Sequence, residues 1–373
     1  MADERDFLIF TPGDVDLSRS PLRRGIEERT YVLGAFNPGL TRLPGGNLLM
    51  MVRVAEALSG PIEGDHVRAI RWTPDGYVLD RHHMAGIDMT DPRQFALKEG
   101  SHRLLALTSL SWLLPVELSP DARTIVAVHY DRIIEPAASY QDYGVEDARI
   151  SRIGDRWYMT TCSVSAERHC TTLHISDNGL DWRLEGVVLD HQNKDMLLFE
   201  GRVDGFFWAL TRPLGEVYFA YPDDSPYAGG PSINLARSPD SLHWKPVEAP
   251  GIRARKGSSS AMKVGGGTPP ILTGAGWLHI YHGVERQQRV GIYRSFWALH
   301  DRDDPSRILR IEDSVPLMEA NPGLTAPIAH RMYLPTPVVF STGMVEAGDD
   351  YIVASGEADL ACRISYIPRS RFA

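Results

Sequence analysis

The sequence predicts an all-β fold built as a β-propeller, in which short strand units repeat around a central axis. Apolar or aromatic strands recur after turn residues, and Asp-Gly and Asn-Gly pairs supply the positive φ angles of tight hairpins. No long window shows the helical periodicity of an amphipathic helix. The 33 glycines and 26 prolines in 373 residues are consistent with many turns. We therefore expect strands throughout, with the functional groups at one mouth of the central funnel.

Six strand units carry this repeat, and each begins directly after a turn. Their strands are Leu48–Arg53, Leu104–Thr108, Trp157–Thr160, Phe206–Leu210, Trp277–Tyr281 and Tyr351–Ala354. Segments such as Ser176–Trp182 and Ser238–Trp244 then place a tryptophan after a second turn, where its ring offers an apolar face to a neighbouring sheet. The units are spaced by about fifty to seventy residues, which is the range of propeller blades rather than of helical repeats.

Residues 1–373 are expected to form a single catalytic domain. No Ser/Gly-rich linker divides the chain. All-β folds of this length often form one domain. The alternatives to a propeller are a β-sandwich or two separate β domains.

The composition argues against several classes of protein. The formal net charge of −9 disfavours a general nucleic-acid binder and a membrane-surface protein. No apolar run reaches the roughly 18 residues that span a bilayer, and the charged segment Met1–Asp6 does not begin a signal peptide. Cys162, Cys170 and Cys362 form no CxxC pair, so we expect a cytoplasmic protein without a metal site or a cofactor.

The segment Tyr143–Ile150 contains two adjacent carboxylates, Glu146 and Asp147, followed by Arg149. A carboxylic acid with a raised pKa can protonate the oxygen of a glycosidic bond as that bond breaks. Glu146 would disfavour ionisation of Asp147 and Arg149 would favour it, so the sequence leaves the pKa of Asp147 open. Asp147 is the candidate catalytic acid, and the alternative is a surface turn with a local ion pair.

Four basic side chains lie close to strands of different units: Lys194, Arg212, Lys263 and His282. Arginine and lysine bind phosphate through charge and through several hydrogen-bond donors. Each residue alone is compatible with a solvated charge or with an ion pair between blades. Because they occupy equivalent points of successive units, we expect them to converge at an anion site.

Several segments, taken in order, make the chain resemble glycoside hydrolase family 130, the β-mannoside phosphorylases and β-mannosidases. The matching segments are Phe36–Gly39, Leu48–Val54, Gly144–Ile150, Ser176–Trp182, Asn193–Asp195, Leu210–Pro213, Lys263–Val284, Val338–Gly343 and Gly356–Asp359. The resemblance runs from about Asn37 to the C-terminus. It rests on the number and order of the segments rather than on any one of them.

The resemblance implies a five-bladed β-propeller that inverts the anomeric configuration of a β-linked manno-oligosaccharide. It also implies that Asp147 protonates the leaving oxygen through a hydroxyl of the bound mannose, while inorganic phosphate attacks the anomeric carbon without a catalytic base. The residues expected to bind the sugar are Asn37, Arg53, Glu146, Arg149 and Asp359. The residues expected in or beside the phosphate site are Lys194, Arg212, Lys263, Tyr281 and His282.

Three features depart from the family pattern. The chain before Asp147 is longer than usual and holds the unit around Leu104, preceded by the motif-like segment Thr90–Arg93. Six units therefore stand where five blades are implied, and the additional unit is either an inserted hairpin or an extra blade. Phe199–Gly201 and Ser258–Met262 replace family motifs near the phosphate region.

The sequence thus predicts inverting phosphorolysis of β-mannosides to mannose 1-phosphate and an acceptor sugar. One rival is an inverting β-mannosidase, which would need a carboxylate base to activate water, with Glu200 and Glu285 as candidates. The other rival is a non-catalytic carbohydrate-binding propeller. The expected partners are a β-linked manno-oligosaccharide and phosphate, with no nucleic acid and no membrane. The linkage, β-1,2 or β-1,4, and the formation of a homo-oligomer stay open.

Overall fold

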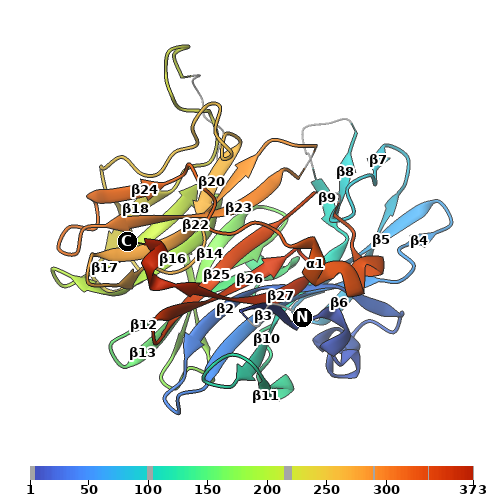
Figure 1. Ribbon diagram of the computed structural model, residues 1–373. Coiled ribbons are helices and arrows are strands. Elements are labelled where there is room, and N and C mark those ends of the chain that lie inside the picture. The colour runs from blue at the N-terminus through green and yellow to red at the C-terminus, as the bar shows by residue number, and fades with distance from the viewer. Residues whose placement is uncertain (1–4, 99–103, 214–220, 289, 335, 373) are drawn as a thin grey trace.

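The structure is a computed structural model that describes residues 5–98, 104–213, 221–288, 290–334 and 336–372. Antiparallel sheets make up nearly all of its regular structure, and the one α-helix within these ranges, α1 (Pro322–Thr325), is a single turn. The all-β prediction is confirmed (Figure 1). None of the described helices is long and apolar enough to cross a membrane. Short 3-10 helices occupy Pro12–Asp14, Leu17–Arg19, Pro21–Arg24, Tyr130–Arg132, Ser139–Gln141, Ala326–Arg331 and Arg369–Phe372.

Five groups of strands repeat along the chain, and the first two share one sheet. Group 1 consists of β2 (Thr30–Arg42), β3 (Leu48–Leu58), β10 (Ser109–Leu118) and β11 (Ile125–Val128). Group 2 consists of β12 (Gly144–Ile153), β13 (Arg156–Val164), β14 (His169–Ser176) and β15 (Arg183–Leu189). Strands within each group pair antiparallel, and a single parallel pair, Ser111 with Gly144, links the two groups.

Three further sheets complete the repeat. Group 3 consists of β16 (Asn193–Val203), β17 (Phe206–Pro213), β18 (Asn234–Ser238) and β19 (Lys245–Pro246). Group 4 consists of β20 (Lys263–Gly266), β21 (Ile271–Leu272), β22 (Trp277–Glu285), β23 (Ile292–His300) and β24 (Ile308–Glu312). Group 5 consists of β25 (Val339–Ala347), β26 (Asp350–Glu357), β27 (Ala361–Pro368) and β1 (Asp6–Phe10). Because β1 pairs with β27, the N-terminal and C-terminal segments share one sheet.

An insert between β3 and β10 forms two small sheets of its own. It consists of β4 (Ile62–Glu63), β5 (His66–Thr73), β6 (Gly76–His83), β7 (Ile87–Asp88), β8 (Gln94–Leu97) and β9 (Leu104–Leu107). Figure 1 shows these strands projecting on one side of the molecule, away from groups 3 and 4. The unit around Leu104 is therefore part of an insertion. The other five units found in the sequence lie in β3, β13, β17, β22 and β26, each of which pairs with the first strand of its group.

The first strands of the groups pack against one another in a cyclic order. β2 contacts β12 and β25, β12 contacts β16, and β16 contacts β20 and β21. The order then closes through β22, which belongs to the same sheet as β20: β22 contacts β25, and β25 contacts β2. Apolar side chains fill the spaces between the groups, as where Leu40 and Val52 of group 1 meet Ile352 of group 5. The first strands therefore bring their remaining side chains to a shared centre.

Candidate active site

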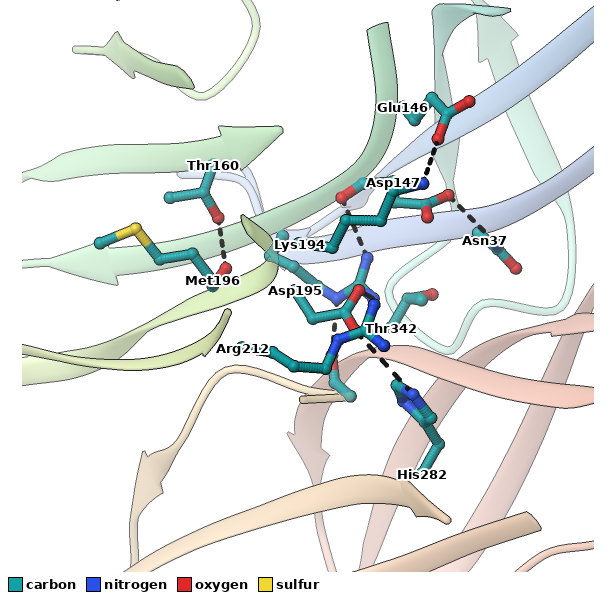
Figure 2. A network of polar contacts seen from close by, with 12 residues as sticks. Asn37, Glu146, Asp147, Thr160, Lys194, Asp195, Met196, Arg212, His282 and Thr342 are labelled. Carbon is teal, nitrogen blue, oxygen red and sulfur yellow. Dashed lines mark hydrogen bonds and ion pairs between the residues drawn. The ribbon is translucent and has the colours of Figure 1, made fainter. Parts of the chain in front are cut away.

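Three first strands carry the same irregularity, and each places a polar side chain at the shared centre. Asn37 in β2, Asp147 in β12 and Asp195 in β16 have φ values of 48°, 52° and 54°. At each of these residues the pairing register with the next strand shifts, as in a β-bulge. Asparagine and aspartate adopt this left-handed conformation more readily than most residues. The repeated bulge brings the three side chains into one network (Figure 2).

Asp147 accepts hydrogen bonds from two of the residues predicted to bind the sugar. Asn37 Nδ2 and Arg53 Nη1 each lie 3.0 Å from Asp147 Oδ1. Arg53 Nη2 also donates to Glu146 Oε1 at 2.8 Å, and Lys194 Nζ donates to Glu146 Oε2 at 3.1 Å. The two adjacent carboxylates are therefore held between an arginine and a lysine, rather than forming an exposed turn.

Asp147 is ionised in the free protein. Burial raises its pKa, but Arg53, Arg149 and Lys194 outweigh burial and hold the pKa of Asp147 below its usual range. Burial likewise raises the pKa of Glu146, and Arg53 and Lys194 again outweigh it and lower that pKa. If Asp147 acts as an acid, its proton must arrive with the reactants.

Asp195 gathers three further basic side chains. Arg212 Nε and His282 Nε2 lie 2.8 Å and 3.9 Å from Asp195 Oδ2. Arg149 Nη2 lies 3.7 Å from Asp195 Oδ1. Arg149 is 1% exposed and donates from Nε to the carbonyl oxygen of Gly267 at 2.7 Å. Arg149 is therefore buried and bonded to protein groups, and its role as a sugar ligand stays a prediction.

A cavity of about 370 Å³ opens in front of this network. The predicted residues that line it are Arg53, Glu146, Lys194, Arg212, Lys263 and Asp359. Lys194 and Arg212 each have a carboxylate partner. Lys263 has no carboxylate partner within the described residues, and its ammonium lies over the ring of Tyr293, 5.1 Å from the centroid. An anion bound in the cavity would supply the counter-charge that Lys263 lacks.

His282 is uncharged at neutral pH. Burial, with Arg212 and Lys263 adding to its effect, holds the pKa of His282 well below the usual range. The imidazole stacks on the ring of Tyr293, with centroids 5.7 Å apart and planes inclined by 26°. A neutral imidazole can donate one hydrogen bond to a phosphate oxygen.

Three carboxylates of the site are paired with cationic side chains. Glu146 and Asp147 pair with Arg53, and Asp195 pairs with Arg212. Across the part of the chain that the structure describes, no group of three or more His, Cys, Asp or Glu side chains is arranged to hold a metal ion. The donors present suit a ligand that is polyhydroxylated or anionic.

The cavity lining that was not predicted as ligands includes three titratable residues, Arg93, His169 and Tyr333. Arg93 comes from the insert, and its Nε and Nη2 donate to Asp91 Oδ1 and Oδ2 at 3.0 Å and 2.9 Å. The Tyr333 hydroxyl donates to the carbonyl oxygen of Asp359 at 2.9 Å. Burial raises the pKa of Asp359, and Arg93 is among the cations that oppose it. Of these three residues, only Arg93 could have been found from the sequence, because its segment contains an Asp-x-Arg pattern.

Tyr281 and Glu285, both singled out in the sequence, do not line the cavity. Tyr281 packs beside Phe296 in the apolar cluster between groups 3 and 4. Because successive side chains of a strand point to opposite faces, Tyr281 turns away where its neighbour His282 turns inward. The role of Tyr281 beside the phosphate stays a prediction. Glu285, a candidate base for hydrolysis, accepts a hydrogen bond from Arg294 Nη1 at 2.7 Å and does not line the cavity.

Glu200, the other candidate base, lines a different cavity of about 290 Å³. Thr41, Arg152 and Met344 also line that cavity. They belong to β2, β12 and β25, and each comes later in its strand than the point where the pairing register shifts. Glu200 itself comes five residues after Asp195 in β16. At about 3.3 Å per residue, this spacing puts Glu200 too far along the strand to share the site.

Glu200→Gln is expected to change how stability depends on pH. Burial raises the pKa of Glu200 from its ordinary 4.5 to about 7. A raised pKa stabilises the fold while the carboxyl is protonated, so this contribution is complete below pH 4.5 and is lost as the pH rises through about 7. The free energy of unfolding, measured with urea, should fall between pH 5 and pH 8 by about 1–3 kcal/mol more in the wild type than in Glu200→Gln. Equal losses in the two proteins would contradict the prediction.

Comparisons with known proteins identify the family of the chain. The family model Glyco_hydro_130, described as beta-1,4-mannooligosaccharide phosphorylase, matches residues 118–371, about two thirds of the chain. The chain is 29% identical to a β-1,2-mannobiose phosphorylase of Listeria innocua over 359 residues, which cover 94% of this chain and 91% of that protein. It is 28% identical to a 1,2-β-oligomannan phosphorylase of Thermoanaerobacter sp. over 250 residues, 64% of this chain and 75% of that protein.

Solved structures give the same result for the fold. The β-1,2-mannobiose phosphorylase of Listeria innocua, in complex with β-1,2-mannobiose, matches with a TM-score of 0.77 and 26% identity over 98% of this chain and 97% of that chain. A glycosyl hydrolase of Bacteroides ovatus matches with a TM-score of 0.62 over 98% and 95% of the two chains, and at 16% identity it is similar in fold alone. The family model begins after the insert, whereas both structural matches extend over nearly the whole chain.

Proposed function

The chain belongs to glycoside hydrolase family 130, and we propose that it catalyses inverting phosphorolysis of β-mannosides to mannose 1-phosphate and an acceptor sugar. It is accordingly an enzyme that acts on β-mannosides. The observation that best supports phosphorolysis is the set of cationic side chains around one cavity. Lys194, Arg212 and Lys263 line it, and the neutral His282 lies 3.9 Å from Asp195, the carboxylate partner of Arg212.

The cations favour phosphate over water as the nucleophile. A phosphate dianion is costly to desolvate unless several donors replace its water, and these side chains offer such donors. Water, in contrast, needs a carboxylate base on the side opposite the acid. Glu200 and Glu285, the two candidate bases, lie outside this cavity. An inverting β-mannosidase is therefore less well supported.

The reaction is balanced without a further reactant. Hydrogen phosphate attacks the anomeric carbon, the bond from that carbon to the glycosidic oxygen breaks, and a single displacement inverts the configuration. The leaving oxygen gains one proton, and the phosphate loses one when mannose 1-phosphate forms. We propose that Asp147 passes the proton to the leaving oxygen through a hydroxyl of the bound mannose. The proton that the phosphate releases then replaces the proton that Asp147 has given up.

Residues around Asp147 would orient the mannose. Asn37 and Arg53 bind Asp147 directly, and Asp359 lines the same cavity. Carboxylate acceptors and arginine donors together suit the vicinal hydroxyls of a sugar. A non-catalytic carbohydrate-binding protein would also need such residues. It would have no use for a buried Asp147 next to an anion site, so we favour the enzyme.

We propose that the five strand groups are the five blades of a propeller and that the insert decorates the first blade. The cyclic contacts support this arrangement: they run from β2 through β12 and β16 to β20, and from β22 of the same sheet to β25 and back to β2. The pairing of β1 with β27 would close the ring within the last blade. A single catalytic domain spanning residues 1–373 is part of the same proposal. The cytoplasmic location and a homo-oligomer stay predictions.

Phosphate dependence tests the proposed function. Purified protein is expected to release mannose 1-phosphate from a β-mannobiose when phosphate is present, with either the β-1,2 or the β-1,4 linkage preferred. Products are identified by ion-exchange chromatography and ³¹P NMR. Free mannose formed at an equal rate with phosphate rigorously excluded would show a mannosidase. Binding of β-mannobiose without any turnover would show the non-catalytic alternative.

A further inference from the structure

Asp359 lies in a tight turn that needs support from its surroundings. Ala358 and Asp359 are the central residues of the turn between β26 and β27, and they have φ values of 58° and 50°. The N–H of Leu360 donates to the carbonyl oxygen of Glu357 at 3.0 Å and closes the turn. Positive φ at both central residues is typical of a type I′ turn, which favours Asn-Gly. Alanine is disfavoured in this conformation because its Cβ approaches the following carbonyl oxygen, so other contacts stabilise the turn.

The direction of the Asp359 side chain depends on the backbone of this turn. Asp359 lines the active-site cavity together with Glu146. Arg53 donates hydrogen bonds to both Glu146 and Asp147. Among the residues that the structure describes, no side chain forms a hydrogen bond or an ion pair with the carboxylate of Asp359. The turn, rather than a side-chain partner, therefore sets where this carboxylate points.

Strand β2 and the segment before β25 both contact the turn. The N–H of Ala35 in β2 donates to the carbonyl oxygen of Leu360 at 2.9 Å. A Cβ at Gly34 would lie 2.4 Å from the carbonyl oxygen of Asp359, so the absence of a side chain there permits the close approach. The Tyr333 hydroxyl donates to the same carbonyl oxygen at 2.9 Å. The turn therefore keeps its position only while β2 and the segment that carries Tyr333 keep theirs.

Glu357, the residue before the turn, connects it to two distant segments. Glu357 is 1% exposed, and its Oε2 accepts a hydrogen bond from Arg363 Nη1 at 2.8 Å. Its Oε1 accepts from the backbone N–H of Asn321, the N-cap of α1, at 2.6 Å. Arg363 also donates from Nε and Nη2 to the two carboxylate oxygens of Asp6 in β1, at 2.6 Å and 2.7 Å. Glu357 therefore joins the turn to β1 and to the segment that leads from α1 to Tyr333 (Figure 1).

We propose that Glu357 is a positioning residue of the active site, which holds the Ala358-Asp359 turn so that the carboxylate of Asp359 is directed at the mannose. This inference rests on the proposed function, in which Asp359 binds the mannose. Glu357 does not line the cavity and would not touch the substrate itself. The alternative is a purely structural role, in which loss of Glu357 lowers stability without a specific effect on the sugar.

The first test removes the charge of Glu357 and retains its shape. Glu357→Gln is expected to lower kcat/KM for β-mannobiose about tenfold, equivalent to about 1.4 kcal/mol. The KM for phosphate should stay within about twofold of the wild type, since Arg212 and Lys263 are unchanged. Glu248→Gln makes the same change at an exposed residue that does not line the cavity, and should keep wild-type values. An unchanged kcat/KM for β-mannobiose in folded Glu357→Gln would overturn the inference.

The second test is a double-mutant cycle with Asp359→Asn. If Glu357 acts through Asp359, adding Glu357→Gln to Asp359→Asn should change kcat/KM for β-mannobiose by less than about twofold. A purely structural residue would instead cause a similar loss in both backgrounds, and a further loss of about tenfold would therefore overturn the inference. Thermal unfolding of all four proteins shows whether stability changes separately from kinetics.

Two provisions keep the test readable. If Glu357→Gln does not fold, Arg363→Lys replaces it in the cycle, because lysine keeps the charge but lacks the fork of donors that reaches both Asp6 and Glu357. If the wild type releases free mannose without phosphate, the proposed phosphorolysis fails, and the same cycle is evaluated from kcat/KM for hydrolysis. If the wild type shows no turnover, the cycle is evaluated from the Kd for β-mannobiose, measured by isothermal titration calorimetry.

Discussion

Asp147→Asn is expected to lower kcat for phosphorolysis by at least about a hundredfold, the effect of removing a general acid. Asparagine retains the shape of the side chain and can still accept a hydrogen bond from Asn37 or Arg53. It cannot take up a proton and pass it on. The KM for phosphate should change little, because Arg212 and Lys263, which are proposed to bind the phosphate, are unchanged in this variant. The measurement is kcat for mannose 1-phosphate formation from a β-mannobiose at saturating phosphate.

A matched control separates the loss of the proton from a general effect of the substitution. Asp349 is an exposed aspartate in the turn between β25 and β26 and does not line the cavity, so Asp349→Asn should keep wild-type kcat. Thermal unfolding of Asp147→Asn shows whether the protein is folded. A folded Asp147→Asn protein with near-normal kcat would show that Asp147 is not the acid.

The ionised state of Asp147 bears on the same experiment. In the free protein, Arg53, Arg149 and Lys194 overcome the effect of burial and keep the pKa of Asp147 low. A conventional general acid instead has a pKa close to the operating pH. Transfer through a sugar hydroxyl would reconcile the two, since the carboxylate needs its proton only when the mannose and the phosphate are both bound.

The strand units could be predicted from the sequence because turn residues and aromatic strands are local signals. Five of the six units lie in strands that pair with the first strand of a repeated group. The sixth, around Leu104, carries the same local signal but lies in an insert. Which role a hairpin takes depends on contacts with residues far away in the sequence, such as the pairing of β10 with β3 across the insert. A local pattern holds no information about such contacts.

Side-chain direction was the least predictable property of the site. The sequence placed Tyr281 and His282 together, but adjacent residues in a strand face opposite sides, so only His282 turns inward. At Asn37, Asp147 and Asp195 the bulges alter this alternation. A turn-forming sequence, Asn37-Pro38-Gly39, marks the first of these bulges, and none marks the other two. The predicted residue types were therefore informative about chemistry, while their orientation required the structure.

Arg212→Ala is expected to raise the KM for phosphate by about 10–100-fold, the effect of losing charge-assisted hydrogen bonds worth about 1.5–3 kcal/mol. The KM for the sugar should rise far less, because the residues around Asp147 remain. Arg212 also pairs with the buried Asp195, so the variant is expected to be less stable as well. Initial rates over a grid of phosphate and β-mannobiose concentrations separate the two KM values.

Two further variants make this result specific to phosphate. Arg212→Lys keeps the charge but loses the planar fork of donors, so its KM for phosphate should lie between those of the wild type and Arg212→Ala. Arg237→Ala removes an exposed arginine of the neighbouring strand β18 and should change neither KM. If Arg212→Ala raises both KM values by the same factor, Arg212 acts on the site as a whole. The cations would then no longer argue for phosphate as the nucleophile, and hydrolysis would have to be reconsidered.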